Sequence, residues 1–201
     1  YPHGQVEQLG APGHPNRDDL GERQLPFTRE VYIERDDFRE EANKKFKRLV
    51  LGKKVRLRNA YVLLAEQVVK DEQGNIVEVH CSYDPDTLGA DPNDGVKPKG
   101  VIHWVSASEG RRATVRIYDR LFNHASPDRG GEDFLEHVNP DSLSVVEDCW
   151  IEPGLANCAP ESRFQFERTG YFVADRYEHS AEQPVFNRTI ALRDSWGKAE
   201  A

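Results

Sequence analysis

The chain of 201 residues is 37% hydrophobic and 31% charged, and its 27 Lys and Arg against 35 Asp and Glu give a formal net charge of -8. No apolar run approaches the roughly 20 residues that span a bilayer, which excludes a transmembrane helix. The acidic balance excludes a protein that binds polyanions over its whole surface.

The start of the sequence and its cysteines indicate the origin and the location of the chain. The sequence contains no Met and opens on YPHGQVEQLG, which indicates a piece of a longer protein. It shows no signal peptide, which predicts a cytoplasmic location. Its three cysteines are odd in number and lack CxxC spacing, so reduced thiols are expected rather than disulfides or a zinc site.

The first half of the chain begins with irregular sequence. Gly and Pro recur in residues 1–25 with little apolar periodicity, and predict a connector or a surface arm. FTREVYIERDDF, at 27–38, alternates well enough for a strand. The following segment has a helical composition with Phe38, Phe46 and Leu49 at helical spacings, and predicts a helix over 36–47.

From Val50 onward the pattern predicts short strands. Gly74 and Asn75 in DEQGN tolerate the positive φ of a tight turn, so the apolar runs on either side predict a β-hairpin. Further strands are expected within 100–108, 113–122, 142–152, 163–175 and 184–192. Short strands without strand–helix alternation indicate an all-β fold of two antiparallel β-barrels with one or two short helices. We assign the first barrel to 26–108 and the second to 109–201, and leave open whether the last strand returns to the first barrel.

Signatures of catalysis are absent from the sequence. It has no GxGxxG, GxxxxGK[ST], GxSxG or HExxH motif, and its seven His have no partner at ligand spacing. We therefore expect no catalytic and no metal-binding residue in the chain.

Basic charge is concentrated in one stretch, which we call the basic segment. Eight of the 27 Lys and Arg lie between Lys44 and Arg58, and no acidic residue occurs between Glu41 and Glu66. The other residues carry 19 basic against 35 acidic groups. A focused positive face on an acidic body directs one polyanion to one place. The alternative interpretation is a solvated strand face balanced by the carboxylates of residues 34–41.

The geometry of the basic segment favours single-stranded or looped RNA over duplex. If residues 55–59 form a strand, Val55 and Leu57 face the core. Arg56 and Arg58 then project from the other face about 6.6 Å apart, near the repeat of an extended nucleotide strand. Guanidinium groups can pair with phosphates or with base edges. The further members of this candidate RNA-binding set are Lys45, Lys47 and Arg48, with Tyr61 as a ring for base stacking.

RFQFER, at 163–168, is a second candidate. Phe164 and Phe166 alternate with polar residues, so the rings are expected in a core and Gln165 on the outer face. The Gln amide carries both a donor and an acceptor, which suits a base edge. From these residues alone, a purely structural strand is the favoured interpretation.

Several of these motifs occur together in one known family. ERDDFREEANKKFKRLVLGKKVRLRNAYV, followed by GVIHWVSA, IYDRLF, FQFERTGYF and PVFNRTIALRDSW, closely resembles the C-terminal anticodon-binding region of bacterial-type glutaminyl-tRNA synthetases. The likeness extends from about Leu25 over nearly the whole chain. It implies two β-barrels after a class I catalytic domain, and a monomer whose partner is tRNA(Gln), with the anticodon bases CUG or UUG held unstacked where the barrels meet.

The resemblance also implies a role for each candidate residue. Three pairs would serve the first, middle and third anticodon bases in turn: Arg56 with Arg58, Gln165 with Arg168, and Lys47 with Arg48. Lys45 stands where the family often has Gln, which replaces an amide contact by a charge contact.

Aminoacylation in this family needs parts that these 201 residues do not contain. The catalytic domain joins glutamine to tRNA using ATP with Mg, and its HIGH and KMSKS signatures are missing here, so we expect the chain alone to be inactive and to hold no cofactor. Three alternatives are a non-bacterial-type glutamyl-tRNA synthetase region, a stand-alone RNA-binding barrel related to ribosomal proteins, and a protein-interaction barrel with an acidic partner.

Overall fold

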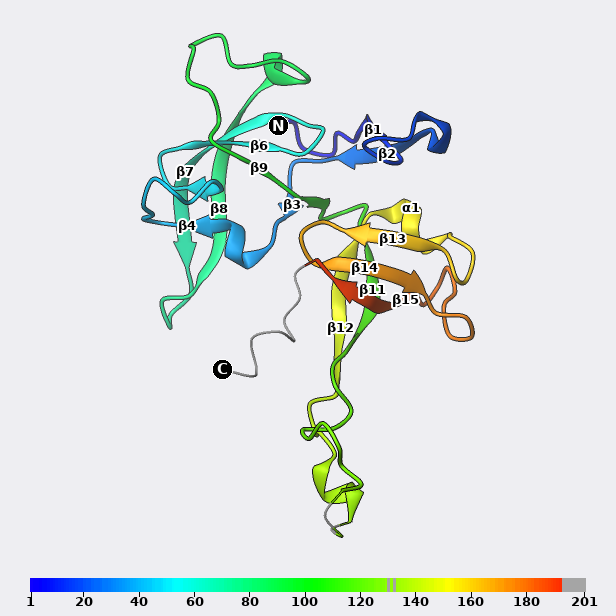
Figure 1. The fold of residues 1–201 in the computed structure, drawn as a ribbon. Coiled ribbons are helices and arrows are strands. Elements are labelled where there is room, and N and C mark those ends of the chain that lie inside the picture. The colour runs from blue at the N-terminus through cyan, green and yellow to red at the C-terminus, as the bar shows by residue number, and fades with distance from the viewer. Residues whose placement is uncertain (130, 132, 193–201) are drawn as a thin grey trace. The chain divides into compact units, whose positions relative to one another are not determined.

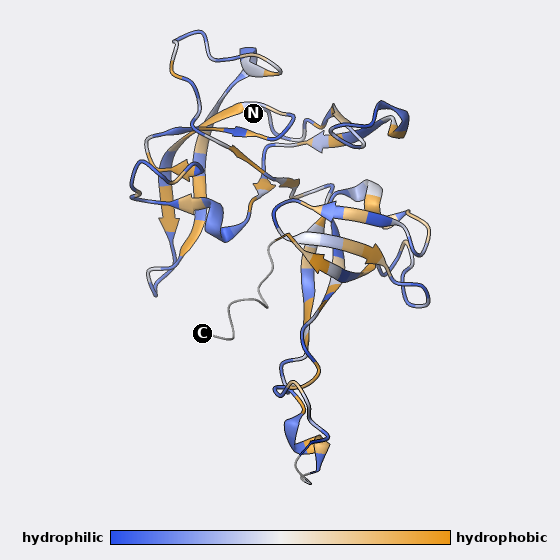
Figure 2. Ribbon diagram, in the orientation of Figure 1, coloured by the Kyte–Doolittle hydropathy of each residue, from blue (hydrophilic) through white to orange (hydrophobic). Residues whose placement is uncertain are grey.

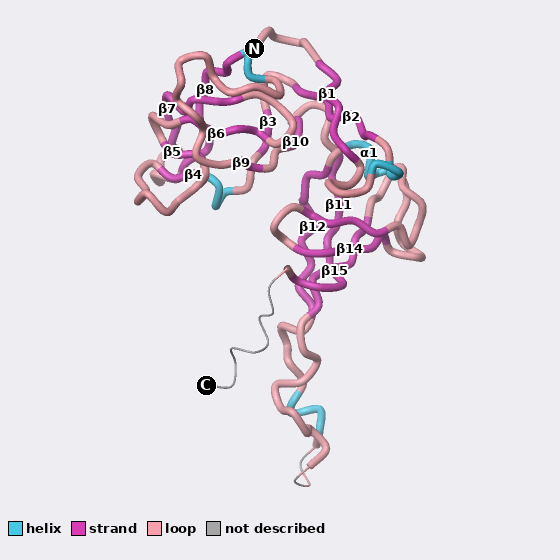
Figure 3. The backbone as a smooth tube through the Cα atoms, turned by 45° about the horizontal axis from the view of Figure 1, so that its top comes forward, coloured by secondary structure: helices cyan, strands magenta, loops and turns pink. Residues whose placement is uncertain are grey.

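The computed structural model describes residues 1–129, 131 and 133–192. The chain divides into two compact units, Tyr1–Gly110 and Arg111–Ala201, which we call the first and the second unit. Strands and loops make up almost all of the described trace (Figure 1 and Figure 3), so the predicted all-β class is confirmed. Apolar residues concentrate on the strands, whereas most connecting loops are hydrophilic (Figure 2).

The first unit is built from ten strands around one main sheet. The strands are β1 (Glu7–Pro12), β2 (Glu22–Phe27), β3 (Val31–Tyr32), β4 (Phe38–Arg39), β5 (Leu49–Val50), β6 (Lys54–Leu57), β7 (Val62–Lys70), β8 (Ile76–Asp84), β9 (Val101–Ile102) and β10 (Val105–Ser106). The main sheet has the order β8-β7-β6-β9, with β9 parallel to β6 and the other pairs antiparallel. The other ladders are β1-β2, β10-β3 and β4-β5.

The hairpin predicted around DEQGN is confirmed as β7 and β8. The carboxylate of Asp71 accepts hydrogen bonds from the backbone N–H groups of Gln73 and Asn75, at 3.0 and 2.8 Å. Gly74 has a φ of +83°, which glycine adopts without the clash that a Cβ would cause. These two features place the turn between the strands.

The first 25 residues contribute to the core of the first unit. β1 and β2 form an antiparallel hairpin, and Leu9, Ala11 and Leu25 are buried. The structure therefore differs here from the expected surface arm. Leu9 and Ala11 do share one face of a strand, but a stretch of two alternating apolar residues among Gly and Pro is too short to distinguish from a loop.

The helix predicted over 36–47 is wrong. The chain forms a 3-10 helix at Arg35–Asp37, then β4, whose Phe38 is buried, and then turns. The side chain of Asn43 accepts a hydrogen bond from the N–H of Lys45 at 2.9 Å, a local turn that competes with helical hydrogen bonding. A helix of this length needs more apolar packing than its few apolar residues supply.

Aromatic side chains fill much of the core of the first unit. The rings of Tyr1, Phe27, Tyr61, Tyr83 and Trp104 contact one another in edge-on or tilted pairs, with centroids 5.0 to 5.4 Å apart. These separations are typical of favourable aromatic pairs. The cluster joins the N-terminal hairpin to the main sheet.

The described part of the second unit contains one mixed sheet and one short α-helix. The elements are β11 (Arg111–Tyr118), β12 (Leu143–Ile151), α1 (Pro153–Ala156), β13 (Arg163–Phe166), β14 (Gly170–Ala174) and β15 (Val185–Ala191). The sheet order is β12-β11-β15-β14-β13, and only the β11-β15 pair is parallel within the described residues. β15 therefore lies inside the sheet of the second unit, between β11 and β14.

The core of the second unit confirms the predicted alternation in RFQFER. Phe172 and Phe186 are almost completely buried, and Phe164 and Phe166 pack against them. The rings of Phe166 and Phe172 are stacked, with centroids 4.2 Å apart.

The strand pairing supports the all-β class but does not by itself show closed barrels. Hydrogen bonding in the described residues divides the strands into five separate sheets of two, two, five, two and four strands. The two barrels and their boundary near residue 108 stay a prediction, and residues 193–201 of the predicted second barrel lie outside the described residues.

Candidate nucleic-acid interface

The basic segment runs through the loop 40–48, β5 and β6 of the first unit. β6 lies between β7 and β9, and its Val55 and Leu57 are 0% exposed, as the sequence predicted. Because side chains alternate along a strand, Lys54 and Arg56 face the other way.

The guanidinium group of Arg56 is bound to a neighbouring loop. Its Nη1 donates to the carbonyl oxygen of Thr87 at 2.6 Å, and its Nη2 donates to that of Ala90 and lies 3.8 Å from the carboxylate of Asp91. The side chain is 19% exposed. This contradicts the expected geometry, in which two guanidinium groups project side by side into solvent. In this structure Arg56 holds the 87–91 loop in place.

Arg58 lies beyond the last residue of β6. Its N–H donates to Ile102 and its carbonyl accepts from the indole N–H of Trp104, both at 2.9 Å, and its side chain is exposed. The next residue, Asn59, has a φ of +57°, a left-handed conformation that ends the strand. Arg58 therefore does not share a strand face with Arg56, and its role toward RNA stays a prediction.

Lys45 and Lys47 are exposed on the loop 40–48. The backbone at Lys47 is closely packed, because a Cβ placed on Gly100 would lie 1.7 Å from the Lys47 carbonyl oxygen. The loop thus presents these cationic side chains from a backbone that a neighbouring segment supports.

Arg48 is half-buried and makes two contacts with one short segment. Its Nε lies 3.2 Å from Oδ1 of Asp37, and its Nη1 donates to the carbonyl oxygen of Asp36 at 3.1 Å. The guanidinium carbons of Arg48 and Arg39 lie 5.9 and 4.6 Å from the centroid of the Phe46 ring. This end of the basic segment is therefore ordered by ionic and cation–π contacts.

The expected stacking role of Tyr61 is wrong for this structure. The residue is 7% exposed, its ring packs against Phe27, and its hydroxyl donates to the Glu7 carboxylate at 2.9 Å. Burial, reinforced by the hydrogen bond to Glu7, raises the pKa of Tyr61 to about 12. The side chain belongs to the aromatic core, where no base can reach its face.

Tyr61 makes the first unit sensitive to alkaline pH. A tyrosine whose pKa is raised on folding contributes its full stabilisation below pH 10, and this contribution is lost as the pH rises toward 12. We expect Tyr61→Phe to lower the melting temperature at pH 8 and to flatten its decrease above pH 10, in differential scanning calorimetry. Tyr177→Phe is the control, because Tyr177 is 86% exposed. An unchanged alkaline decrease in Tyr61→Phe would contradict the assignment.

The second candidate surface lies on the β13–β14 hairpin of the second unit. Gln165 is exposed on β13 opposite Tyr171 of β14, and Arg168 is exposed in the turn with a φ of +60°. The N–H of Thr169 donates to the carbonyl of Phe166 at 3.0 Å and closes this turn. The structure thus places Gln165 and Arg168 on one hairpin with side chains accessible to a ligand.

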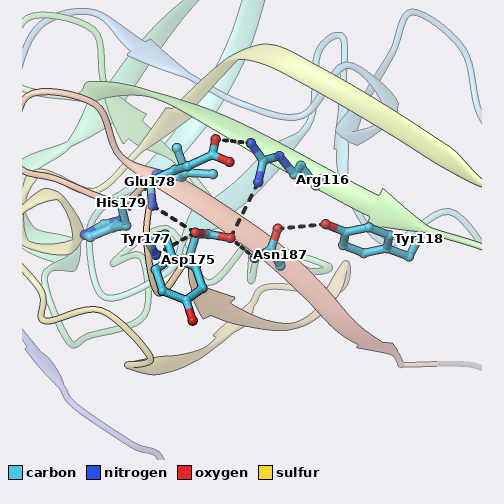
Figure 4. Close-up of polar contacts among 8 residues, drawn as sticks. Arg116, Tyr118, Asp175, Tyr177, Glu178, His179 and Asn187 are labelled. Carbon is cyan, nitrogen blue, oxygen red and sulfur yellow. Dashed lines mark hydrogen bonds and ion pairs between the residues drawn. The ribbon is translucent and has the colours of Figure 1, made fainter.

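A polar network in the second unit was not expected from the sequence. Arg116 pairs with the carboxylates of Glu178 and Asp175, the side-chain N–H of Asn187 donates to Asp175 at 2.7 Å, and the hydroxyl of Tyr118 donates to Asn187 at 3.3 Å (Figure 4). The hydrogen bond from Asn187, with backbone N–H groups, lowers the pKa of Asp175. These residues come from β11, β15 and the loop between β14 and β15, so no local pattern signals them. Two carboxylates around one guanidinium do not suit a phosphate backbone.

Neither a metal-binding group of side chains nor a membrane-spanning helix is found in the described residues. Among residues 1–129, 131 and 133–192, no group of three or more His, Cys, Asp or Glu is arranged to hold a metal ion. In the same part of the chain, no helix has the length and apolar character needed to cross a bilayer.

Comparison with known families identifies the family of this chain. Two family models match, at residues 1–84 and 101–175, and both describe the anticodon-binding domain of class I tRNA synthetases (E and Q). The chain belongs to this anticodon-binding family. The resemblance seen in the sequence motifs is thereby confirmed.

Similar members of the anticodon-binding family are longer proteins. Glutamine–tRNA ligases of Tolumonas auensis, Vibrio parahaemolyticus and Pseudomonas syringae pv. tomato are 58%, 57% and 56% identical over 196, 197 and 198 residues. Each alignment covers 98% of this chain but only 34 or 35% of the relative. The chain thus spans about a third of the length of the curated relatives it matches.

Proposed function

We propose that this chain is the anticodon-recognising region of a glutamine–tRNA ligase and binds the anticodon loop of tRNA(Gln). The observation that supports this most strongly is the 58% identity to a glutamine–tRNA ligase over 98% of the chain. Glutamine rather than glutamate is proposed because the relatives that align with the chain carry the former name.

The first unit would supply cationic contacts to the loop. Lys45 and Lys47 are exposed, and Arg48 is 36% exposed beside them. We assign Lys47 and Arg48 to the third base, as the family resemblance implies, and Lys45 to a charge contact. Lysine offers a point charge and arginine a planar fork, so Arg48 is better suited to a base edge and Lys45 to a phosphate.

Arg56 and Arg58 would contact the first base from different positions, and not as a pair on one strand face. The contacts of Arg56 with Thr87 and Ala90 use only part of the N–H groups of its guanidinium. We propose that these contacts hold the group ready to present its other N–H groups to the base. Arg58 would approach from the turn that follows β6.

The remaining assignments follow from the same proposal. ATP with Mg and the joining of glutamine to tRNA would belong to parts of the longer protein outside these residues. The chain would act as a monomer in the cytoplasm, with each unit adopting the barrel architecture implied by the family.

The middle base provides a direct test. Hairpin RNAs whose loop carries CUG, or CUG with one base replaced, can be titrated against the chain by fluorescence anisotropy at one fixed salt concentration, because affinity depends on salt. We expect Gln165→Ala to reduce the preference for U at the middle position by about 1 kcal/mol, or roughly fivefold. The preference at the other two positions should change much less.

Matched variants make this test specific. Gln8→Ala removes another exposed glutamine, from β1, and should leave all three preferences unchanged. If Gln165→Ala weakens all hairpins equally, Gln165 contacts the backbone and not the base. If the unmodified chain shows no preference for CUG over loops with replaced bases, the proposed function is wrong.

A further inference from the structure

Asp37 is a buried carboxylate next to the basic segment. It lies at the end of the 3-10 helix Arg35–Asp37, is 1% exposed, and its backbone N–H donates to the carbonyl of Glu34 at 2.9 Å. A buried carboxylate is costly unless an opposite charge and hydrogen bonds compensate for the lost water. Arg48 supplies an opposite charge, with its Nε 3.2 Å from Oδ1 of Asp37.

The segment around Asp37 holds two of the three nitrogens of the Arg48 guanidinium. Asp37 forms an ion pair with Nε, and the carbonyl oxygen of the preceding residue, Asp36, accepts a hydrogen bond from Nη1 at 3.1 Å. Neither contact uses Nη2. Because the guanidinium is planar and rigid, the hydrogen bond at Nη1 and the charge pairing at Nε together restrict where Nη2 lies.

The exposure of the two partners differs sharply. The Arg48 side chain is 36% exposed, whereas that of Asp37 is 1% exposed. One end of the ion pair is thus anchored inside the first unit and the other end reaches solvent, where Lys47 is also exposed. In this arrangement the buried Asp37 carboxylate can orient the partly exposed Arg48 guanidinium.

We propose that Asp37 is a positioning residue for anticodon recognition, because it fixes the Arg48 guanidinium so that Nη2 faces the RNA. This inference rests on the proposed function. Arginine loses considerable side-chain entropy when it is ordered at an interface, and a side chain that is already ordered avoids this loss on binding. Asp37 would therefore increase base discrimination without touching the RNA.

A double-mutant cycle tests the coupling between the two residues. The variants are Asp37→Asn, which keeps the size and one oxygen but removes the charge, Arg48→Ala, and the two combined. The readout is the preference ratio, which is the dissociation constant of a hairpin with the third base replaced divided by that of the CUG hairpin. We expect Asp37→Asn to reduce this ratio by about tenfold in the unmodified chain and by less than about twofold when Arg48 is already Ala.

Further variants separate positioning from stability. Arg48→Lys keeps a cation opposite Asp37 but lacks the planar fork, so it should lose the third-base preference while the chain stays folded by circular dichroism. Glu41→Gln removes an exposed carboxylate from the loop 40–48 and should leave the preference unchanged. If Asp37→Asn does not fold, Arg48→Lys still tests the inference, which requires the planar fork of Arg48 for the third-base preference.

The outcomes distinguish this inference from the function on which it rests. If the unmodified chain has no third-base preference, the proposed function fails. If it has that preference and Asp37→Asn retains it, or loses it equally in the Arg48→Ala background, Asp37 is not a positioning residue. A preserved preference in Arg48→Lys also overturns the inference.

Discussion

Gly100→Ala should lower the free energy of unfolding of the first unit by about 3 kcal/mol. A Cβ at this position would lie 1.7 Å from the carbonyl oxygen of Lys47 and 2.6 Å from its carbon, and both are backbone atoms that cannot rotate away. The Gly100 carbonyl also accepts the N–H of Arg56 at 3.1 Å, so a shift of Gly100 disturbs β6. Urea unfolding followed by amide hydrogen exchange in β6 and β7 measures the loss in this unit.

Gly10→Ala is the control for Gly100→Ala. Gly10 lies in β1 of the same unit, and a Cβ there meets only the Glu22 carboxylate at an ordinary 3.6 Å. Its effect should stay below about 1 kcal/mol. Equal stability of the two variants would show that the segment around Gly100 moves without cost, and that the backbone at Lys47 is not supported by it.

Arg56→Ala should cost the first unit about 2 to 3 kcal/mol. The change removes the guanidinium that pairs with the carbonyl oxygens of Thr87 and Ala90 and leaves those acceptors without their charged donor. Hydrogen exchange in residues 85–91 should accelerate more than exchange in the β7–β8 hairpin. Urea unfolding of the chain gives the total loss, and hydrogen exchange locates it.

Two further variants test whether the guanidinium of Arg56, and not merely a positive charge, stabilises the loop. Lys53→Ala removes an exposed cation from the basic segment and should leave stability within about 0.5 kcal/mol of the unmodified chain. Arg56→Lys keeps the charge but has one nitrogen where the guanidinium has three, so it should recover only part of the loss. A fully stable Arg56→Ala would mean that the loop does not depend on this side chain, and would restore Arg56 as a purely surface residue.

Local patterns in the sequence were sufficient for several elements. The alternation in RFQFER correctly predicted that Phe164 and Phe166 pack in a core, and the alternation in the basic segment predicted the burial of Val55 and Leu57. These predictions worked because side chains of a strand alternate between faces whatever the strand pairs with. The prediction of a turn at DEQGN was correct for a similar reason, because the positive φ that the turn requires is adopted by Gly74 within the turn itself.

Predictions from local patterns were wrong where a residue contacts a partner that is distant in the sequence. Helical spacing suggested 36–47, yet Phe38 is buried in a strand that pairs with β5, and short helices depend on packing that spacing alone does not reveal. Tyr61, which follows the basic segment, was expected to offer its ring for base stacking. Its ring instead joins the aromatic core, and its hydroxyl meets Glu7, 54 residues earlier.

The sequence by itself determined the all-β class, the concentration of positive charge between Lys44 and Arg58, and membership in the anticodon-binding family, because each depends on residue types and their spacing. Only the tertiary structure decided which of those cations are exposed. Arg56 is held by the 87–91 loop and Arg48 by Asp37, whereas Lys45 and Lys47 remain at the surface. The physical reason is that a charge run specifies the sign of a field, while the orientation of each side chain depends on the carbonyls and carboxylates that folding brings beside it.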